Sequence, residues 1–316
     1  MDMIHVRAVS PPDLTEHAMA LLRAEPGVVN LVLQPDSAFG PDGDAIECDV
    51  LTGAANDVLR GLRDLGLVRR GSIVLDPVDT VFSDHAAKAG AEVFGARLSA
   101  PVWEQVEAHI RAEGRYPPSF YLFLVIAGLI GAVGIFTNSQ ILIVGAMVVS
   151  PEYGAITSVA LAIDQRSRRG VRRGLWALFE GFLPVIVTTF LFALLVRGLD
   201  LQPKAFALGL RPVSRLINSP NFFSLVVAVL AGIAGIVSLA EARTRALLGV
   251  FISVTTIPAA ADIGVSCAFA EWPEARGSLL QLLLNIVVLI VVGTGTLKCQ
   301  RAIWRRVGAR GRTRPA

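Results

Sequence analysis

The sequence predicts an α-helical polytopic membrane protein that is preceded by a soluble α+β domain. The chain has 316 residues, of which 53% are hydrophobic and only 17% are charged. Its mean hydropathy of +0.59 lies well above the range of soluble globular domains. Residues 116–151 contain no charged side chain, whereas charges are frequent before them. A run of that length is enough for one spanning helix of about 20 residues and most of a second.

Residues 1–80 are predicted to form a ferredoxin-like domain with the element order βαββαβ. Short β-branched or alternating runs indicate strands, and helical spacing of Ala18, Leu21 and Leu22 after a Pro-Pro-Asp start indicates a helix. The predicted strands are 4–9, 28–33, 45–51 and 72–75, and the predicted helices are 13–24 and 56–65. Such domains often bind small ligands or pair with copies of themselves, although fold alone implies neither.

Two segments of the N-terminal part have simple interpretations. The stretch 36–44 intersperses three carboxylates with glycines, but it lacks the D-x-[DN]-x-[DN]-G spacing and the late Glu of a calcium loop. We therefore expect a polar hairpin loop there. Residues 81–114 are predicted to form a linker helix that packs between domains or subunits. Its apolar side consists of Val93, Phe94, Val102, Trp103, Val106 and Ile110.

The start of the chain has no basic segment followed by an apolar one, so no cleavable signal peptide is indicated and the first domain is expected in the cytoplasm. Cys48, Cys267 and Cys299 have no C-x-x-C spacing and are interpreted as free thiols. The expected location is a bacterial-type cytoplasmic (inner) membrane, with the N-terminal domain and the basic tail, 299–316, on the cytoplasmic side.

Six membrane helices are predicted within residues 115–298, at about 119–137, 140–163, 175–197, 220–240, 245–270 and 277–298. The second connection is predicted to be cytoplasmic because it carries Arg166, Arg168, Arg169, Arg172 and Arg173. The tail is placed on the same side by Arg301, Arg305, Arg306, Arg310, Arg312 and Arg314. The third connection argues against this topology, because the topology would place its basic residues outside. These residues are Arg197, Lys204, Arg211 and Arg215. An interfacial helix at 205–218 would tolerate those charges.

The membrane region resembles itself at an offset of 104 residues, so that Ala127-Gly128-x-x-Gly131-x-Val133 aligns with Ala231-Gly232-x-x-Gly235-x-Val237. The halves would be about 119–197 and 220–298. Each half contains a proline in its second helix, Pro151 or Pro258, with a carboxylate soon after it. Three helices per half is an odd number, so the sequence predicts a 3+3 inverted repeat with broken helices, as in many secondary transporters.

The broken helices predict a site, because backbone groups freed by a proline persist in a membrane only where protein or water surrounds them. A charged side chain at depth costs at least about 2.5 to 3.5 kcal/mol on insertion scales, so intramembrane carboxylates should face an interior or an aqueous path. The predicted solute or ion path consists of Ser150, Pro151, Glu152, Gly154, Glu180, Thr255, Thr256, Pro258, Asp262 and Asn285.

Each of these residues also has a purely structural interpretation. The prolines could be packing kinks, and Glu152 and Asp262 could lie in shallow interfacial water. Glu180 could pair with Arg172 and Arg173, which are about two turns away. Asn285 could make an interhelical hydrogen bond. The glycines are interpreted as positions of close helix approach; they are Gly128, Gly131, Gly134, Gly232 and Gly235.

Residues 115–298 resemble an uncharacterised hydrophobic domain family, domain of unknown function 389. The motif that carries the resemblance is Asn138-Ser139-x4-Val144-Gly145-Ala146-Met147-x3-Pro151-x2-Gly154. The run 249–264 with Pro258, and the later Leu284-Asn285, are similar to the family's other recurring segment. The resemblance implies a polytopic integral membrane protein and no established activity. Apolar residues are common in the family where Glu152, Tyr153 and Asp262 stand here, and a second proline where Ala259 stands.

The leading functional hypothesis is a transporter or channel-like permease for a small solute or ion, in which the carboxylates bind a proton or sodium ion and the N-terminal domain regulates. The alternative is a membrane-anchored ligand sensor or oligomeric scaffold without transport. An enzyme is disfavoured, since G-x-S-x-G, H-E-x-x-H and phosphate-loop motifs are absent. The four histidines, His5, His17, His85 and His109, lie outside the membrane region without ligand spacing.

No cofactor or metal is therefore expected. The expected partners are the lipid bilayer, a small solute or ion and further copies of the chain, since a sheet edge and a linker helix both offer pairing surfaces. Nucleic acid is not expected, because an arginine-rich tail beside a membrane helix is better suited to anionic lipid headgroups.

Overall fold

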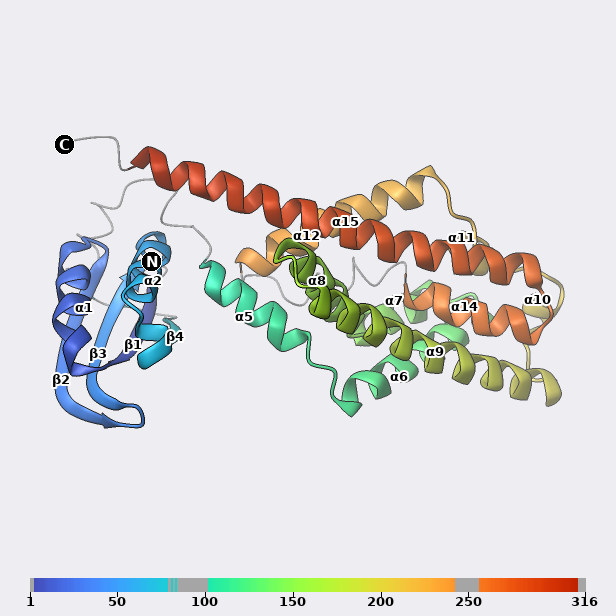
Figure 1. Ribbon diagram of the computed structural model, residues 1–316. Helices are drawn as coiled ribbons and strands as arrows, with labels where there is room; N and C mark the ends of the chain where they lie inside the picture. The colour runs from blue at the N-terminus through green and yellow to red at the C-terminus, as the bar shows by residue number, and fades with distance from the viewer. Residues whose placement is uncertain (1–2, 79–80, 82, 84–101, 242–255, 312–316) are drawn as a thin grey trace. The chain divides into compact units, whose positions relative to one another are not determined.

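The computed structural model describes residues 3–78, 81, 83, 102–241 and 256–311. The chain divides into two compact units (Figure 1). The first, here the N-terminal unit, comprises Met1–Val106 with Arg301–Ala316, and the second, here the membrane unit, comprises Glu107–Gln300. Each unit is described by itself.

The N-terminal unit is built on an antiparallel sheet of four strands in the order β2-β3-β1-β4. Its elements are β1 (Met3–Ser10), α1 (Pro12–Ala24), β2 (Val28–Phe39), β3 (Asp42–Leu51), α2 (Thr52–Asp64), α3 (Leu67–Arg70) and β4 (Ser72–Val78). Alternate residues of β1 and β3, such as Val6 and Cys48, are buried in one core with α1 and α2. Apart from the short α3, the element order is the predicted βαββαβ.

The predicted loop at 36–43 was wrong in extent. Strand β2 continues to Phe39 and β3 begins at Asp42, so the turn between them is much shorter than the sequence suggested. Two irregularities in the pairing of β2 with β3 accommodate this long hairpin. Asp44 is not a surface loop residue: its carboxylate accepts hydrogen bonds from Thr15 Oγ1 at 2.6 Å and from Asp36 N at 2.9 Å.

The membrane unit is entirely helical among its described residues. Helix α5 (Trp103–Glu113) begins in the first unit and ends in the second. The others are α6 (Pro118–Thr137), α7 (Gln140–Val149), α8 (Glu152–Asp164), α9 (Arg168–Gly198), α10 (Lys204–Ala207), α11 (Pro212–Ile217), α12 (Phe222–Glu241), α14 (Ile257–Ala268) and α15 (Trp272–Gly311). The predicted linker positions Val93 and Phe94 lie outside the described residues.

Four described helices are long and apolar enough to cross a membrane, and the bent pair α7 and α8 would make a fifth. The predicted break at Pro151 is present, since α7 and α8 meet at an angle of 54°. Of the predicted helix 245–270, residues 245–255 lie outside the described residues, and the remainder forms the short α14. Pro258 stands in the first turn of α14, where proline is tolerated because its missing N–H has no partner to lose.

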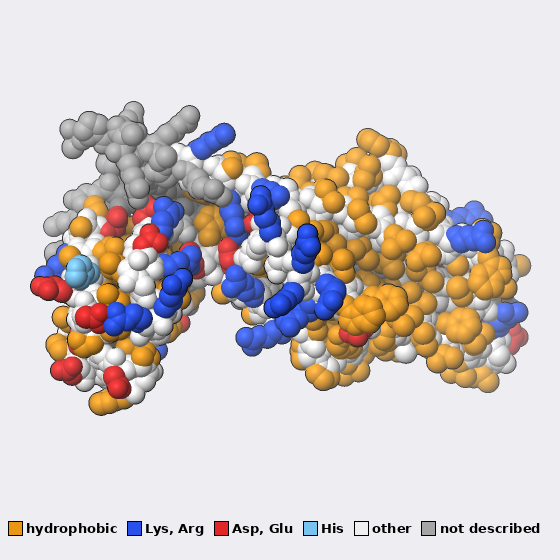
Figure 2. Space-filling model, viewed as in Figure 1, with side chains coloured by type: hydrophobic (Ala, Val, Ile, Leu, Met, Phe, Trp, Pro, Cys, Tyr) orange, Lys and Arg blue, Asp and Glu red, His pale blue; other side chains and the backbone are white. Residues whose placement is uncertain are grey.

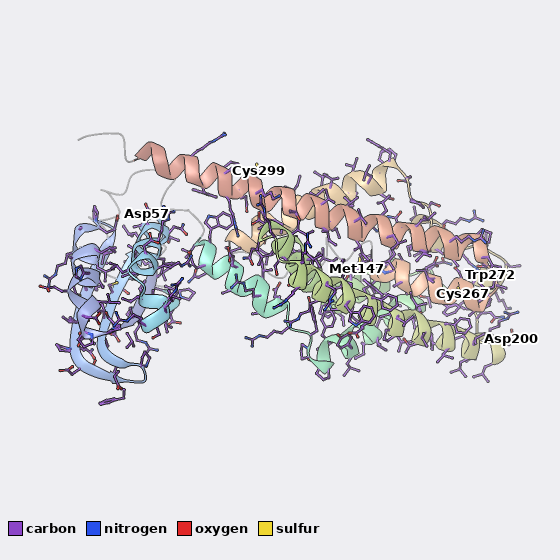
Figure 3. All side chains as sticks on the ribbon, viewed as in Figure 1. Asp57, Met147, Asp200, Cys267, Trp272 and Cys299 are labelled. Carbon is purple, nitrogen blue, oxygen red and sulfur yellow. The ribbon has the colours of Figure 1, made fainter. Side chains whose placement is uncertain are left out.

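The arginine-rich second connection differs from the prediction. Only Gln165–Ser167 connects α8 to α9, and α9 already begins at Arg168. Four of the five arginines therefore lie on the first turns of a helix. We call the side of the membrane unit that carries these arginines the basic end. The side where α9 ends and α15 begins is called the opposite end. Asp200 and Trp272 lie together at the opposite end (Figure 3).

The elements repeat along the membrane unit with the offset found in the sequence. Both bounds of α12 lie 104 residues after those of α6, and α15 begins 104 residues after α9. Helix α14 begins 105 residues after α8 and ends 104 residues after it. Helices α6 and α9 run from the basic end to the opposite end, whereas α12 and α15 run the other way (Figure 1).

Glycines permit close crossings in the core of this bundle. Gly264 of α14 lies so near α9 that an added Cβ would stand 2.7 Å from Ile186 O and 2.8 Å from Phe190 N. Gly128 of α6 faces Val185 of α9 in the same way. Side chains of α6, α8, α9, α14 and α15 share one buried apolar cluster. Helix α14 is thus enclosed although it is too short to cross a membrane alone.

The predicted interfacial helix at 205–218 is instead two short helices, α10 and α11, with a turn between them. Phe206 is fully buried and packs on Phe136 and Phe269. Phe206 of the connection between the two halves is therefore packed into the opposite end of the bundle.

Candidate functional site

The first residue of α8 and the residue before α14 meet inside the membrane unit. Thr256 Oγ1 donates a hydrogen bond to Glu152 Oε1 at 2.6 Å, and Ser150 Oγ donates to Glu152 Oε2. Glu152 is 1% exposed and Thr256 is fully buried. Glu152 and Thr256 are 104 residues apart, which is the offset of the repeat. Two short helices, one from each half, therefore begin beside each other around one carboxylate.

Asp262 holds the second buried carboxylate, on α14. Ser214 Oγ of α11 donates to Asp262 Oδ1 at 2.6 Å, and Ser278 Oγ of α15 donates to Asp262 Oδ2 at 2.6 Å. Asp262 and Ser278 are fully buried, and Ser214 nearly so. The two hydroxyls come from two different elements, so this carboxylate ties the connection between the halves to the last long helix.

Two amides continue the buried polar groups along α15. Gln281 Nε2 donates to Asn285 Oδ1 at 3.1 Å, and Gln281 Oε1 is buried without a hydrogen-bond partner. With a rise of about 1.5 Å per helical residue, Asn285 lies about 10 Å further along α15 than Ser278. By the same rise, Thr256 just before α14 lies about 9 Å from Asp262, and this displacement has the same direction as that from Ser278 to Asn285. We call these residues the buried polar column: Ser214, Asp262, Ser278, Gln281, Asn285, Thr256, Glu152 and Ser150.

Three of the other residues on the predicted path, Pro151, Gly154 and Pro258, have structural roles near this column. Pro151 caps α8 at its N-terminus, and Pro258 lies buried in the first turn of α14. Gly154 is buried, where an added Cβ would stand 2.9 Å from the backbone oxygen of Glu113. Thr255 lies outside the described residues.

Glu180 is not brought to the column. It is exposed on α9, where Trp176 Nε1 donates to its Oε1 at 2.5 Å and Tyr121 OH donates to its Oε2 at 3.4 Å. The predicted alternative, a pair with Arg172 or Arg173, is not among its observed contacts. An indole and a phenol bind this carboxylate instead.

The motif residues of the first half are mainly structural. Asn138 ends α6 in the left-handed conformation, with φ 51°, and its Nδ2 donates to Leu210 O at 2.9 Å. Ser139 caps α7 by accepting a hydrogen bond from Leu142 N. Ala146 and Met147 are buried against neighbouring helices, while Gly145 has open space around its Cα. The motif thus builds the turn and short helix that precede Pro151.

Sequence reasoning missed Ser214, Ser278 and Gln281. Serine and glutamine in apolar surroundings are common, so their residue types alone gave no signal. Ser214 lies 48 residues before Asp262, and Ser278 lies 16 after it. A usable signal was the spacing of Ser278, Gln281 and Asn285, which places all three on one face of α15.

Two of the three arginines of the third connection are bound within the protein at the opposite end, while Arg215 is exposed. Arg197 donates to Ala268 O at 2.7 Å, at the last residue of α14. Arg211 forms a salt bridge with Glu271, donates to Phe206 O, and stacks on the Phe206 ring at 3.6 Å. Hydrogen bonding to helix-terminal carbonyls and ion pairing explain why these charges are tolerated in this connection.

Helix α5 contacts α8 along its length within the membrane unit. Ser158 Oγ donates to Ile110 O at 3.1 Å, and Gln165 Nε2 donates to Glu107 Oε2 at 2.7 Å. Gly154, one turn from the buried polar column, touches Glu113 of the same helix. The half-helix that carries Glu152 is therefore packed against the segment that leads out of the N-terminal unit.

The N-terminal unit has its own polar groups, and they are typical of structural roles. The Thr15 hydroxyl and the Asp36 N–H hold the pKa of Asp44 below its usual range, because both donate to the ionised carboxylate. Burial raises the pKa of the Cys48 thiol to about 12, which makes it unreactive. All three cysteines are free thiols, as predicted. No cluster of three metal-ligating side chains occurs among the described residues.

Comparison with known proteins gives a family and no activity. The family described as domain of unknown function (DUF389) matches residues 147–291. An uncharacterized protein of Methanocaldococcus jannaschii is 22% identical over 169 residues, which is 53% of this chain and 50% of that protein. The chain thus spans about half the length of this relative. No solved structure matches. The resemblance seen in the sequence is confirmed by this family match over residues 147–291.

Proposed function

We propose that this protein is a membrane transporter or channel-like permease for a small solute or ion, with the buried polar column as its path and proton or sodium coupling at Glu152 and Asp262. The observation that carries the proposal is the meeting of α8 and α14 at a buried carboxylate, Glu152, inside an apolar helical unit. Burying a carboxylate is costly unless its charge is balanced. Such residues in membrane helices mark ion and substrate pathways.

The partners of the two carboxylates support coupling to a cation. Asp262 accepts two hydrogen bonds from serine hydroxyls, and Glu152 accepts two from Ser150 and Thr256. Hydroxyls do not supply a compensating positive charge. Arg211 at the opposite end is paired with Glu271. In the proposal, a proton or a small cation binds at these carboxylates and leaves with the transported solute.

We further propose that residues 119–197 and 220–298 are an inverted repeat. This is supported by the common offset of the element bounds and by the opposite directions of α6 and α12 and of α9 and α15. In such repeats, binding sites form where interrupted helices of the two halves meet. The hydrogen bond between the equivalent positions 152 and 256 would lie on the axis that relates the halves.

We assign the N-terminal unit a regulatory role through α5. Trp103 N donates to Asn56 Oδ1 at 3.2 Å in the N-terminal unit, and later residues of the same helix contact α8 in the membrane unit. One helix thus contacts α2 in the one unit and the half-helix bearing Glu152 in the other. The proposal includes a cytoplasmic location of the basic end and a homo-oligomeric assembly.

The test is ion flux in proteoliposomes that contain the full chain. Sodium, proton, chloride, phosphate and amino-acid gradients are imposed in turn, and flux is read with ion-sensitive dyes or radiolabelled solutes. We expect flux that responds to a proton or sodium gradient and that falls at least tenfold in Glu152→Gln and Asp262→Asn. The matched control is Glu180→Gln, which removes an exposed carboxylate outside the column and should leave flux unchanged.

Two results would contradict the proposal. One is wild-type flux that does not exceed empty liposomes for any of these gradients, although the protein is folded and inserted. The other is flux whose dependence on pH and sodium survives in the double variant Glu152→Gln, Asp262→Asn. The second result would be consistent with transport but would contradict the role of the two carboxylates in coupling.

A further inference from the structure

Six exposed guanidinium groups gather at the basic end of the membrane unit, and we call them the arginine patch. They belong to Arg115, Arg166, Arg168, Arg169, Arg172 and Arg173. None of the six takes part in a salt bridge among the residues that the structure describes. Figure 2 shows Lys and Arg side chains gathered at the border of the hydrophobic surface of the membrane unit. The patch is therefore a concentration of exposed positive charge that forms no salt bridge within the described part of the chain.

The arrangement within α9 opposes the stability of the helix. Arg168 and Arg172 are four residues apart, as are Arg169 and Arg173, and like charges at that spacing repel. All four stand in the first turns, where the helix dipole favours negative charge. A local arrangement that disfavours the helix, with no compensation among the described residues, indicates an external partner.

The patch borders the exposed apolar surface of α9. Trp176, 59% exposed, follows one turn after Arg172 and Arg173, and the exposed Phe179 and Leu183 come next on the same helix. Indoles prefer the boundary between headgroups and hydrocarbon. Glu180, which follows on the same helix, accepts its hydrogen bonds from Trp176 and Tyr121.

The opposite end is different, which makes the patch more than a general property of membrane helix ends. Arg197 and Arg211 are bound to Ala268 O and Glu271 within the protein. The exposed cations there, Lys204, Arg215 and Arg276, come from three separate elements. Between the two ends of the membrane unit, only the basic end carries several exposed guanidiniums on consecutive turns of one helix among the described residues.

We propose that the arginine patch binds the phosphate groups of anionic phospholipids in the leaflet at the basic end. Guanidinium groups bind phosphate through paired, charge-assisted hydrogen bonds, and a neighbouring apolar surface accommodates the acyl chains. A soluble anion would use the charge but not the exposed Trp176, Phe179 and Leu183. The proposal does not depend on transport, since it concerns the outer surface of the bundle.

The test measures thermal unfolding of the full chain in a neutral detergent with phosphatidylglycerol or phosphatidylcholine added. A ligand that binds the folded state raises the unfolding midpoint in proportion to the logarithm of its concentration. We expect phosphatidylglycerol to raise the midpoint by several degrees more than phosphatidylcholine. The triple variant Arg169→Gln, Arg172→Gln, Arg173→Gln should lose more than half of that difference, and added salt should reduce it in the wild type.

The control variant removes the same charge at the opposite end, by Lys204→Gln, Arg215→Gln and Arg276→Gln, and should keep the phosphatidylglycerol effect. If the triple patch variant does not fold, Arg172→Gln alone should show a smaller loss in the same direction. Equal effects of the two lipids on the wild type would overturn the proposal, and so would equal losses in the two triple variants. It would also be overturned if inorganic phosphate alone reproduced the stabilisation, since the patch would then be a site for soluble anions.

Discussion

Helices α8 and α14 are the two short helices that begin at the centre of the bundle, yet they are enclosed by different parts of the chain. Helix α8 packs on α5, the segment that leads out of the N-terminal unit. Helix α14 packs deeply on α9, and its Asp262 binds Ser214 of the connection between the halves. Two equivalent elements therefore have different neighbours, one from outside the repeat and one from within it.

The difference indicates which half would move if the protein has more than one state. A Cβ added at Gly264 of α14 would meet two backbone atoms of α9, Ile186 O and Phe190 N, as well as the Thr189 hydroxyl, so this crossing leaves little room for α14 to shift. The contacts of α8 with α5 include exposed polar pairs such as Gln165 with Glu107, which are weak in water. We therefore expect α14 to be the fixed half-helix and α8 the adjustable one.

Substitution of the crossing glycines should show the largest difference. An alanine at Gly264 meets two backbone atoms of α9 at 2.7 and 2.8 Å, so we expect Gly264→Ala to destabilise by about 3 kcal/mol. Gly154→Ala, against α5 at 2.9 Å, should cost about 1 kcal/mol because α5 can shift. Gly145→Ala is the control, since it has open space and should be neutral or slightly stabilising. Thermal unfolding of the full chain measures all three, and equal costs for Gly264 and Gly154 would remove the distinction between the half-helices.

Removal of a hydroxyl from each carboxylate should have an intermediate effect. Thr256→Val removes a donor from Glu152, and Ser214→Ala removes a donor from Asp262. Loss of one partner of a buried charged acceptor costs about 2 kcal/mol. A double-mutant cycle with Glu152→Gln and Thr256→Val should give a coupling energy of about 1 kcal/mol across the two halves. A coupling near zero would mean that the contact between α8 and α14 does not hold the halves together.

Effects smaller than those of Gly264→Ala and of the hydroxyl removals are expected at the contacts of Gln165 and Arg211. Gln165→Ala removes an exposed hydrogen bond to α5 and should cost about 0.5 kcal/mol or less. Arg211→Gln leaves Glu271 without its cation and removes the stacking on Phe206, so we expect about 1.5 kcal/mol. The free energies of unfolding of both variants can be measured by chemical unfolding in mixed micelles. The reverse order would indicate that α5 holds α8 more firmly than α11 holds α14.

Local patterns predicted those parts of the molecule that depend on neighbouring residues. The alternation along β1 and β3 predicted the sheet, and Pro151 predicted the bend of 54° between α7 and α8. Glu152 and Asp262 could be expected to be buried because carboxylates in apolar runs must avoid lipid. Of their partners, Ser150 and Thr256 were among the predicted path residues, whereas Ser214 and Ser278 were not, since they reach Asp262 through tertiary contacts over 48 and 16 residues.

Two errors also have physical causes. The stretch 36–39 has the glycine, proline and aspartate neighbours of a turn, yet Ala38 and Phe39 pair with β3 and Asp36 N donates to Asp44, so the strand continues through it. Glu180 was placed on the path because a carboxylate in an apolar helix is costly, but it is exposed and bound by Trp176 and Tyr121. In the stretch 36–39, tertiary pairing was stronger than the local preference for a turn. At Glu180, hydrogen bonds from aromatic side chains stabilise the carboxylate at the surface, so it is not buried.

The hydrogen bond between Glu152 and Thr256 also has a consequence for biosynthesis. At about 5 to 20 residues per second, the ribosome makes Thr256 roughly 5 to 20 s after Glu152. During that interval the first half has been delivered to the membrane without α14, against which its core is packed. The nascent chain must therefore hold α8 near the insertion machinery until the second half arrives, so the two halves are expected to mature together and a chain that stops after α9 should be a substrate for membrane proteases.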